Sequence, residues 1–254
     1  MSRTLKILCM ASGVLATAAT AAWAAPGVDL AWNQCRGKAG AVTTRTFACA
    51  ATTGQQALYA SVNPPSGITQ LEGAEIYVDY MESNSALTCW WNFSAGTTRA
   101  GALTPLALPP TDANGDATIL CGACNTAPCP PGNGTDGFYF LAKGGTGGGG
   151  GIVIGANTGQ LKGIVAIGSG TGVAVPADVQ QYACGFRISN ASTGAGCTGC
   201  DDGVVLTLSR VTLTQPGVPN VDVTNPSLGN SIIWNTPTPT RKATWGAVKA
   251  LYRN

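Results

Sequence analysis

The sequence predicts a mainly β protein, folded as an antiparallel β-sandwich or a jelly-roll-like relative of one and crosslinked by disulfides. Two observations predict this fold. Short runs of β-branched and aromatic residues recur along the chain and are bounded by Gly, Pro, Asn and Asp, which is typical of strands joined by turns. The 254 residues also include ten cysteines and begin with the pattern of an export signal. The spacing of the runs favours a sandwich over alternating strands and helices.

The N-terminus has the features of a secretory signal peptide. Arg3 and Lys6 precede an apolar stretch of small residues that ends at Ala24. A positive start, a short apolar stretch and a small-residue cleavage site define such signals. We expect a signal peptide over 1–24 and a single β-sandwich domain over 25–254, secreted to the extracellular space or periplasm and free of the membrane. The alternative, a retained membrane anchor, is disfavoured because the stretch is short for a span.

The charge balance argues against a nucleic-acid partner. The whole chain carries 14 Lys and Arg against 12 Asp and Glu. Removal of the signal peptide takes away two positive charges and no negative one, so the mature chain has no net charge. Proteins that bind nucleic acid need an excess of positive charge that displaces counterions. We therefore expect no such partner.

The expected strands follow one another along most of the chain. They are 28–33, 45–49, 56–62, 74–81, 89–93, 138–142, 152–154, 161–167, 182–188, 204–213 and 231–234. In the fourth, Ile76, Val78 and Tyr80 share one face and polar residues the other, which predicts one buried and one solvated face. In the tenth, the apolar residues change parity, which predicts a β-bulge near Ser209 or Arg210.

Two further stretches complete the expected fold. The run 143–151 is nearly all glycine, and we interpret it as a floppy surface hairpin, with an anion cradle as the alternative. Near the C-terminus, Thr244 is expected to cap a short helix that places Trp245, Val248 and Tyr252 along one stripe.

Nine cysteines follow the signal peptide. They are Cys35, Cys49, Cys89, Cys121, Cys124, Cys129, Cys184, Cys197 and Cys200. In an oxidising compartment disulfides are the default, and an odd number leaves one thiol over. We expect a Cys35–Cys49 bond first, because each residue ends an expected strand, and a Cys124–Cys129 bond next.

Two C-x-x-C units, 121–124 and 197–200, permit two alternatives to structural disulfides: a four-thiolate zinc site and a thiol-exchange enzyme. The gap between the units is far longer than in zinc ribbons, and neither unit lies between a strand and a helix. We therefore expect structural disulfides and no cofactor.

Three residues resemble the start of a calcium loop. Asp112, Asn114 and Asp116 place oxygen ligands at alternate positions. Ala117 stands where such a loop needs glycine, and no Glu follows at the twelfth position. We therefore expect a hairpin turn and no metal, with calcium as the alternative.

The chain contains no histidine, which removes Ser-His and Cys-His nucleophiles and imidazole-bound metals. Paired carboxylates, as in glycoside hydrolysis, remain. Glu75 and Asp79 share a strand face but lie roughly 13 Å apart, farther than a hydrolytic pair. Together with Glu82 we interpret them as an exposed strand face. The sequence leans against an enzyme and names no catalytic residue.

The candidate ligand-binding residues are aromatic or next to an aromatic residue. Trp90 and Trp91 are neighbours on an expected strand, so their side chains should face opposite ways. An exposed Trp91 beside Tyr77 or Asp79 would stack on a sugar ring. The alternative is that both tryptophans pack in the core.

Several motifs together resemble a group of uncharacterised secreted bacterial β-rich proteins. They are VDLAWNQC at 28–35, TFAC at 46–49, PPSGI at 64–68, WW at 90–91, CTGC at 197–200 and TWGAVKALYR at 244–253, which is of the TWGxxKxLYR type. The resemblance spans 28–253 and brings no function with it. It implies a further cysteine at the start of the strand after the C-x-x-C unit, where this chain has Val204 and Val205. Cys184 is then the substitute partner.

Taken together, these observations predict a non-catalytic extracellular binding or structural module with an unidentified ligand. The alternative is a secreted protein that binds or acts on carbohydrate, for which the ligand is a glycan.

Overall fold

The computed structural model describes residues 25–51, 53–106, 146–166, 172, 174–175, 177, 180–191 and 197–235. Several sequence predictions lie outside these residues: the signal peptide, the strand 138–142, the C-terminal helix, Asp112, Asn114, Asp116, Cys121, Cys124 and Cys129. In the described part of the chain, no helix has the length and apolar character needed to cross a membrane.

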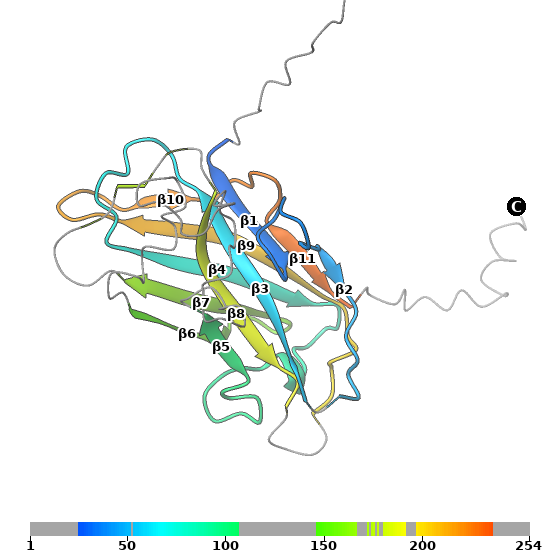
Figure 1. The fold of residues 1–254 in the computed structure, drawn as a ribbon. Coiled ribbons are helices and arrows are strands. Elements are labelled where there is room, and N and C mark those ends of the chain that lie inside the picture. The colour runs from blue at the N-terminus through cyan, green and yellow to red at the C-terminus, as the bar shows by residue number, and fades with distance from the viewer. Residues whose placement is uncertain are drawn as a thin grey trace, which may run out of the picture.

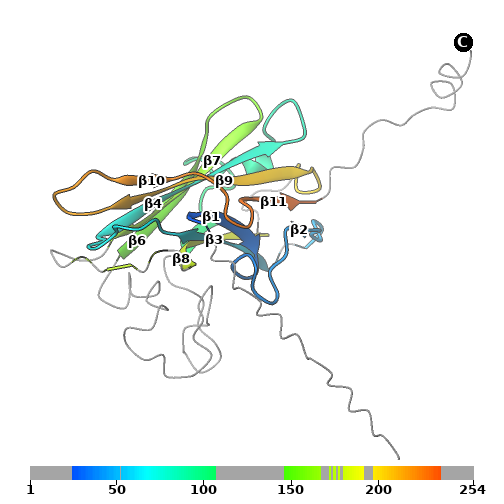
Figure 2. The ribbon, with the colours of Figure 1, turned by 90° about the horizontal axis from the view of Figure 1, so that it is seen from above.

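The eleven described strands form two sheets that lie one above the other (Figures 1 and 2). Sheet A has the order β1 (Gly27–Trp32), β3 (Gln55–Asn63), β8 (Gln181–Ser189) and β5 (Leu103–Leu106). Sheet B has the order β2 (Thr44–Arg45), β11 (Ser231–Trp234), β9 (Val204–Thr214), β4 (Gly73–Glu82), β7 (Thr158–Ala166) and β6 (Thr146–Val153), with β10 (Val221–Val223) also on β9. All pairs are antiparallel except β2 with β11. The predicted fold class is therefore confirmed.

Alternation along the strands explains why the sheets stack. On β4, Ile76, Val78 and Tyr80 are buried, whereas Tyr77 and Met81 lie on the outer face of sheet B. Apolar side chains from both sheets thus fill the space between them, and removing their surface from water stabilises the fold.

The bulge predicted in β9 is present. Arg210 pairs with Tyr77 and Leu208 pairs with Val78, so Ser209 is the extra residue. The bulge returns Val211 to the core side, because one inserted residue changes the parity of every residue after it.

The described part of the glycine run belongs to a hairpin, as predicted, but it is a regular paired strand and not a floppy segment. β6 pairs with β7 along its whole length. A Cβ atom added to Gly151 would lie 2.8 Å from Phe93 Cβ and 3.4 Å from Leu103 Cδ2. Glycine therefore permits a close approach between β6 and the chain beneath it.

A cluster of aromatic residues fills one end of the core. Trp234 lies at its centre, with its ring centroid between 3.6 and 6.4 Å from those of Phe47, Trp32, Trp90 and Trp91. Such contacts add to the stabilisation that burial alone provides.

The disulfides join residues that are far apart in the chain. Cys49 is bonded to Cys200 and Cys89 to Cys197. The predicted Cys35–Cys49 bond is therefore wrong, and Cys35 is bonded to a different cysteine. Proximity along the chain misled the prediction, because the sheet order brings the 197–200 segment next to Cys49 and Cys89.

These bonds also overturn two alternatives for the second C-x-x-C unit. Cys197 and Cys200 are both oxidised, each to a distant partner, so they are neither zinc ligands nor a thiol-exchange pair. Cys184 is a buried free thiol and is not their substitute partner.

The two sheets meet along two seams. At the closed seam, β1 bonds to the segments beside β2 and β11: Val28 N–H donates to Asn225 O, Leu30 N–H to Gly229 O and Trp32 N–H to Val42 O, at 2.8 to 3.1 Å. The open seam lies between β5 and β6, which run close together in Figure 1. In the described part of the chain, no backbone hydrogen bond joins β5 to β6.

Candidate functional site

The predicted residue Tyr77 lies on the outer face of sheet B, and cations on the two neighbouring strands hold its ring. Lys162 Nζ on β7 is 5.0 Å from the ring centroid, and Arg210 Cζ on β9 is 4.2 Å from it. The Tyr77 hydroxyl donates to Glu75, which also forms a 3.1 Å ion pair with Lys162. The ring is thus engaged by its own sheet instead of presenting a free face to a sugar.

The carboxylates of this face are also paired. Asp79 accepts a 2.7 Å hydrogen bond from Gln160, and Asp222 lies 3.7 Å from Arg210. Hydrogen bonds from Tyr77 and Lys162 hold the pKa of Glu75 below its usual value. These carboxylates stabilise the strand face as cross-strand pairs do, which fits the interpretation of Glu75 and Asp79 as a polar face.

Glu82, in contrast, is not part of that exposed face. Its side chain is on the core side of β4 and is 1% exposed. The Thr88 N–H and hydroxyl each donate to its carboxylate at 2.6 Å. Burial raises the pKa of Glu82, and the nearby Asp202 carboxyl raises it further. Strand parity explains the error, because Glu82 follows Tyr80 by two residues and so points the same way.

Trp90 and Trp91 do not face opposite ways. They belong to the 3-10 helix η1 (Cys89–Trp91), and both rings are buried, Trp91 completely. The expected exposed sugar-stacking ring is therefore absent at this position, and the alternative of two core tryptophans is correct. Tyr77 and Asp79 lie on the outer face of sheet B while Trp91 lies inside, so the three candidate residues do not come together.

The free thiol is not a reactive group. Cys184 is buried between the sheets, and burial raises its pKa to about 12. A thiol attacks only as the thiolate, and this one stays protonated at neutral pH.

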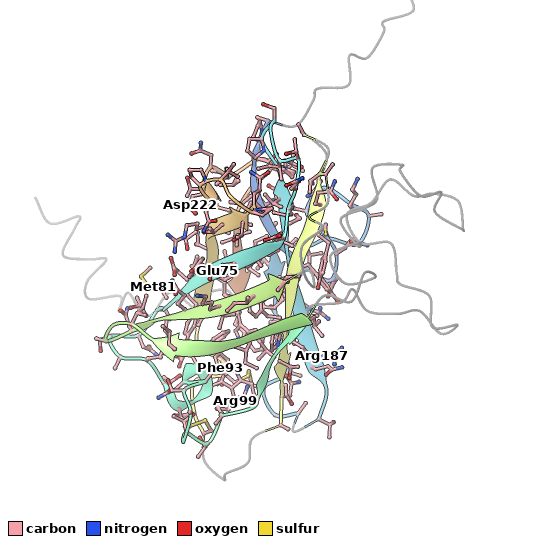
Figure 3. The ribbon with its side chains drawn as sticks, turned by 90° about the vertical axis from the view of Figure 1, so that its left-hand side faces the viewer. Glu75, Met81, Phe93, Arg99, Arg187 and Asp222 are labelled. Carbon is pink, nitrogen blue, oxygen red and sulfur yellow. A yellow bond between two sulfur atoms is a disulfide. The ribbon has the colours of Figure 1, made fainter. Side chains whose placement is uncertain are left out.

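The open seam holds a groove of about 470 Å³. Its lining consists of Phe93, Ser94, Ala95, Ala100, Gly101, Leu103, Gly150, Gly151 and Ile152. Phe93 and Leu103 are 5% and 8% exposed and form the floor, whereas Ala95 and Ala100 are exposed at the rim. Figure 3 labels Phe93 just below the two green strands and above Arg99. We take this groove as the candidate functional site.

One wall of the groove is held in place by a buried arginine. Arg99 is completely buried and donates to the carbonyls of Trp90, Ala191 and Ser189 at 3.2, 2.6 and 2.8 Å. Its guanidinium lies 3.8 Å from the Trp90 ring centroid, and burial lowers its pKa to about 10. The 92–102 segment is therefore fixed to β8 before any ligand arrives.

A second hollow lies at one end of the outer face of sheet B. It measures about 300 Å³ and is lined by Asp79, Tyr80, Met81, Ile154, Thr158, Val205 and Thr207. Met81 and Ile154 are 53% and 55% exposed there. Exposed apolar residues are common singly, so this hollow is weaker evidence for a site than the groove.

Sequence reasoning missed the open-seam groove. β5 contains Pro105 and has only four residues, so no strand pattern indicated it. One signal was available, since a run of glycines that leads directly into Ile152 and Val153 is typical of a strand that another backbone approaches closely.

Comparisons with known proteins assign no family. No family model matches the chain, and no curated protein matches it. The chain is distantly similar to ACE19, the collagen binding subdomain of the Enterococcus faecalis surface protein ACE, at 8% sequence identity and a TM-score of 0.24, over 77% of this chain and 95% of that one. A likeness this weak carries no argument about either chain.

Proposed function

We propose that the protein is a secreted, non-catalytic extracellular binding module, and that the open-seam groove is its binding site. One contrast carries the proposal. The groove has a fixed wall and an apolar floor, whereas the polar side chains on the outer face of sheet B are paired with one another. Binding sites are commonly concave and apolar, with few polar groups.

Secretion is supported by the crosslinks and by the N-terminal pattern. The bonds Cys49–Cys200 and Cys89–Cys197 suit an oxidising compartment. The charged start and apolar stretch before Ala25 are typical of an export signal.

The chemistry of the groove supports binding over catalysis. The described residues that line it carry no acid, base or thiol, and the chain has no histidine. Glu82 and Asp202 lie close enough to interact, but neither lines the groove. A carbohydrate-acting protein would need a carboxylate at the bound ligand.

The test uses the mature chain 25–254 on a peptide array and a glycan array in parallel. We expect peptides to retain the protein, and we expect Ala100→Trp, which fills the groove, to abolish retention. Ala39→Trp is the matched control, because Ala39 is an exposed alanine beside the closed seam. Retention that Ala100→Trp leaves unchanged, or release of sugar from the glycans, would contradict the proposal.

A further inference from the structure

β6 is the edge strand of sheet B in the described part of the chain, and this edge indicates what kind of ligand the groove takes. We propose that an extended peptide adds to β6 as a further strand of sheet B and places alternate apolar side chains in the groove. This inference rests on the proposed function, because it names the chemical class of partner for the same site. An unpaired strand edge offers a row of N–H and C=O groups, which an extended backbone complements.

β6 is the one described sheet edge without protection. β5 is four residues long and contains Pro105, β2 is two residues long and ends at Arg45, and β10 is three residues long and contains Asp222. The closed seam covers β1. β6 has eight residues, TGGGGGIV, with no charge, no proline and an unbroken register with β7. Charges, prolines, bulges and short length are the usual means by which edges avoid a further strand.

The hydrogen bonds of the hairpin show which groups are free. Ile154 N–H donates to Thr158 O on the β6 side of β7, and Glu82 N–H donates to Asn157 O on the β4 side. Antiparallel strands alternate, so Gly148, Gly150 and Ile152 direct their backbone groups at β7. The residues between them, Gly147, Gly149 and Gly151, direct theirs to the open edge. In the described part of the chain, β7 is the one strand that pairs with β6.

The groove favours a foreign peptide over a second copy of the chain. A strand added about 4.8 Å from β6 would lie above the 93–101 segment, and its inward side chains would enter the groove beside Phe93 and Leu103. A second copy paired through its own β6 would present Gly147, Gly149 and Gly151 on that inward face. These residues have no side chains, so the groove would stay empty.

The lining also limits the charge of the peptide. All of the lining residues named above are uncharged. A charged side chain placed among them would lose its water without gaining a partner, which disfavours binding. We therefore expect an uncharged segment with apolar residues at alternate positions.

The experiment uses a defined probe, a peptide of alternating Val and Thr flanked by lysines for solubility, added to the isotope-labelled mature protein. We expect the amides of Gly147, Gly149 and Gly151 to gain at least tenfold protection from hydrogen exchange, while those of Gly148 and Gly150 change little. The probe N-methylated at the residues that face β6 should not bind, and the probe N-methylated at the intervening residues should bind. Equal binding of both N-methylated probes would overturn strand addition.

Two variants separate this inference from the proposed function. Ala100→Trp should weaken probe binding at least tenfold, and Ala39→Trp should leave it unchanged. If the probe does not bind while array peptides still bind in an Ala100-dependent way, strand addition is wrong and the proposed function stands. If Ala100→Trp affects neither, both are wrong. Protection of the three edge glycines without the probe, together with a dimer in sedimentation, would show that a second copy occupies the edge and would also overturn the inference.

Discussion

The two seams of the sandwich differ in how the edges of the two sheets meet. At the closed seam, β1 bonds to the chain beside β2 and β11, and the buried Asp29 accepts hydrogen bonds from Leu228 and Gly229 N–H at 2.5 and 2.8 Å. At the open seam, β5 and β6 approach each other without pairing and leave a groove. The closed seam thus joins the two sheets by hydrogen bonds, whereas the open seam leaves room for the ligand that we propose.

The largest expected effect concerns the aromatic cluster at the closed-seam end. Trp234→Ala should lower the free energy of unfolding by about 5 kcal/mol, because the ring is completely buried and its Nε1 donates to Cys200 O at 2.7 Å. Denaturant unfolding measures this loss. A loss below about 1 kcal/mol, which is typical of an exposed side chain, would show that the aromatic cluster does not contribute strongly to stability.

Removal of either disulfide tests the difference between the two seams. The Cys49→Ala/Cys200→Ala double variant should lose about 4 kcal/mol of stability, because the bond closes a long loop. Under native conditions its groove should still bind the Val/Thr probe. In Cys89→Ala/Cys197→Ala, which frees the start of the 92–102 segment, probe affinity should fall in the fraction that remains folded. Equal probe affinities in the two double variants would show that the Cys89–Cys197 bond does not support the groove more than the Cys49–Cys200 bond does.

Local sequence patterns predicted the strands better than the disulfide pairing. The alternation of Ile76, Val78 and Tyr80 predicted β4 and its buried face, and the parity change predicted the Ser209 bulge, because both depend only on local periodicity. The cysteine pairing depends on which strands become neighbours, and no local pattern encodes that.

The candidate site was harder to predict than the fold. Trp91 followed an expected strand pattern, yet a single turn of 3-10 helix turns it into the core. Tyr77 was correctly placed on a solvated face, but its cationic neighbours come from β7 and β9. The groove needs β5, β6 and the 93–101 segment together, and their proximity is a property of the assembled sheets.

A matched pair of glycine substitutions tests whether β6 is a strand. Gly151→Val should destabilise the protein by about 2 kcal/mol, because a Cβ there meets Phe93. Gly150→Val should be neutral or slightly stabilising, since no atom lies within 4 Å of the added Cβ and valine favours strands. Thermal unfolding of the two variants measures the difference. Equal thermal midpoints in the two variants would show that the glycine run is not a strand with Gly151 packed against Phe93.

The smallest effect is the pH dependence at the closed seam. Burial raises the pKa of Asp29 above its usual value, so the native state holds this proton more tightly than the unfolded state. This contribution to stability is complete below the ordinary pKa of Asp and is lost as the pH rises through the raised value. Glu82, whose pKa is also raised, acts in the same direction.

Asp29→Asn should therefore flatten the decline in stability as the pH rises above the ordinary pKa of Asp, about 4, because the amide oxygen still accepts from Leu228 and Gly229 but does not titrate. Urea midpoints across that range give the slope. Identical slopes in the wild type and the variant would show that Asp29 does not titrate as its burial requires.

Residue-specific amide exchange in the unliganded mature protein shows directly whether the closed seam is paired and the outer edge of β6 is unpaired. We predict slow exchange at Val28, Leu30 and Trp32 of the closed seam. Along β6 we predict an alternation, slow at Gly148 and Gly150 and fast at Gly147, Gly149 and Gly151. Uniformly slow exchange along β6 would mean that its outer edge is already paired, and uniformly fast exchange would mean that it is not a strand; either result would contradict the account.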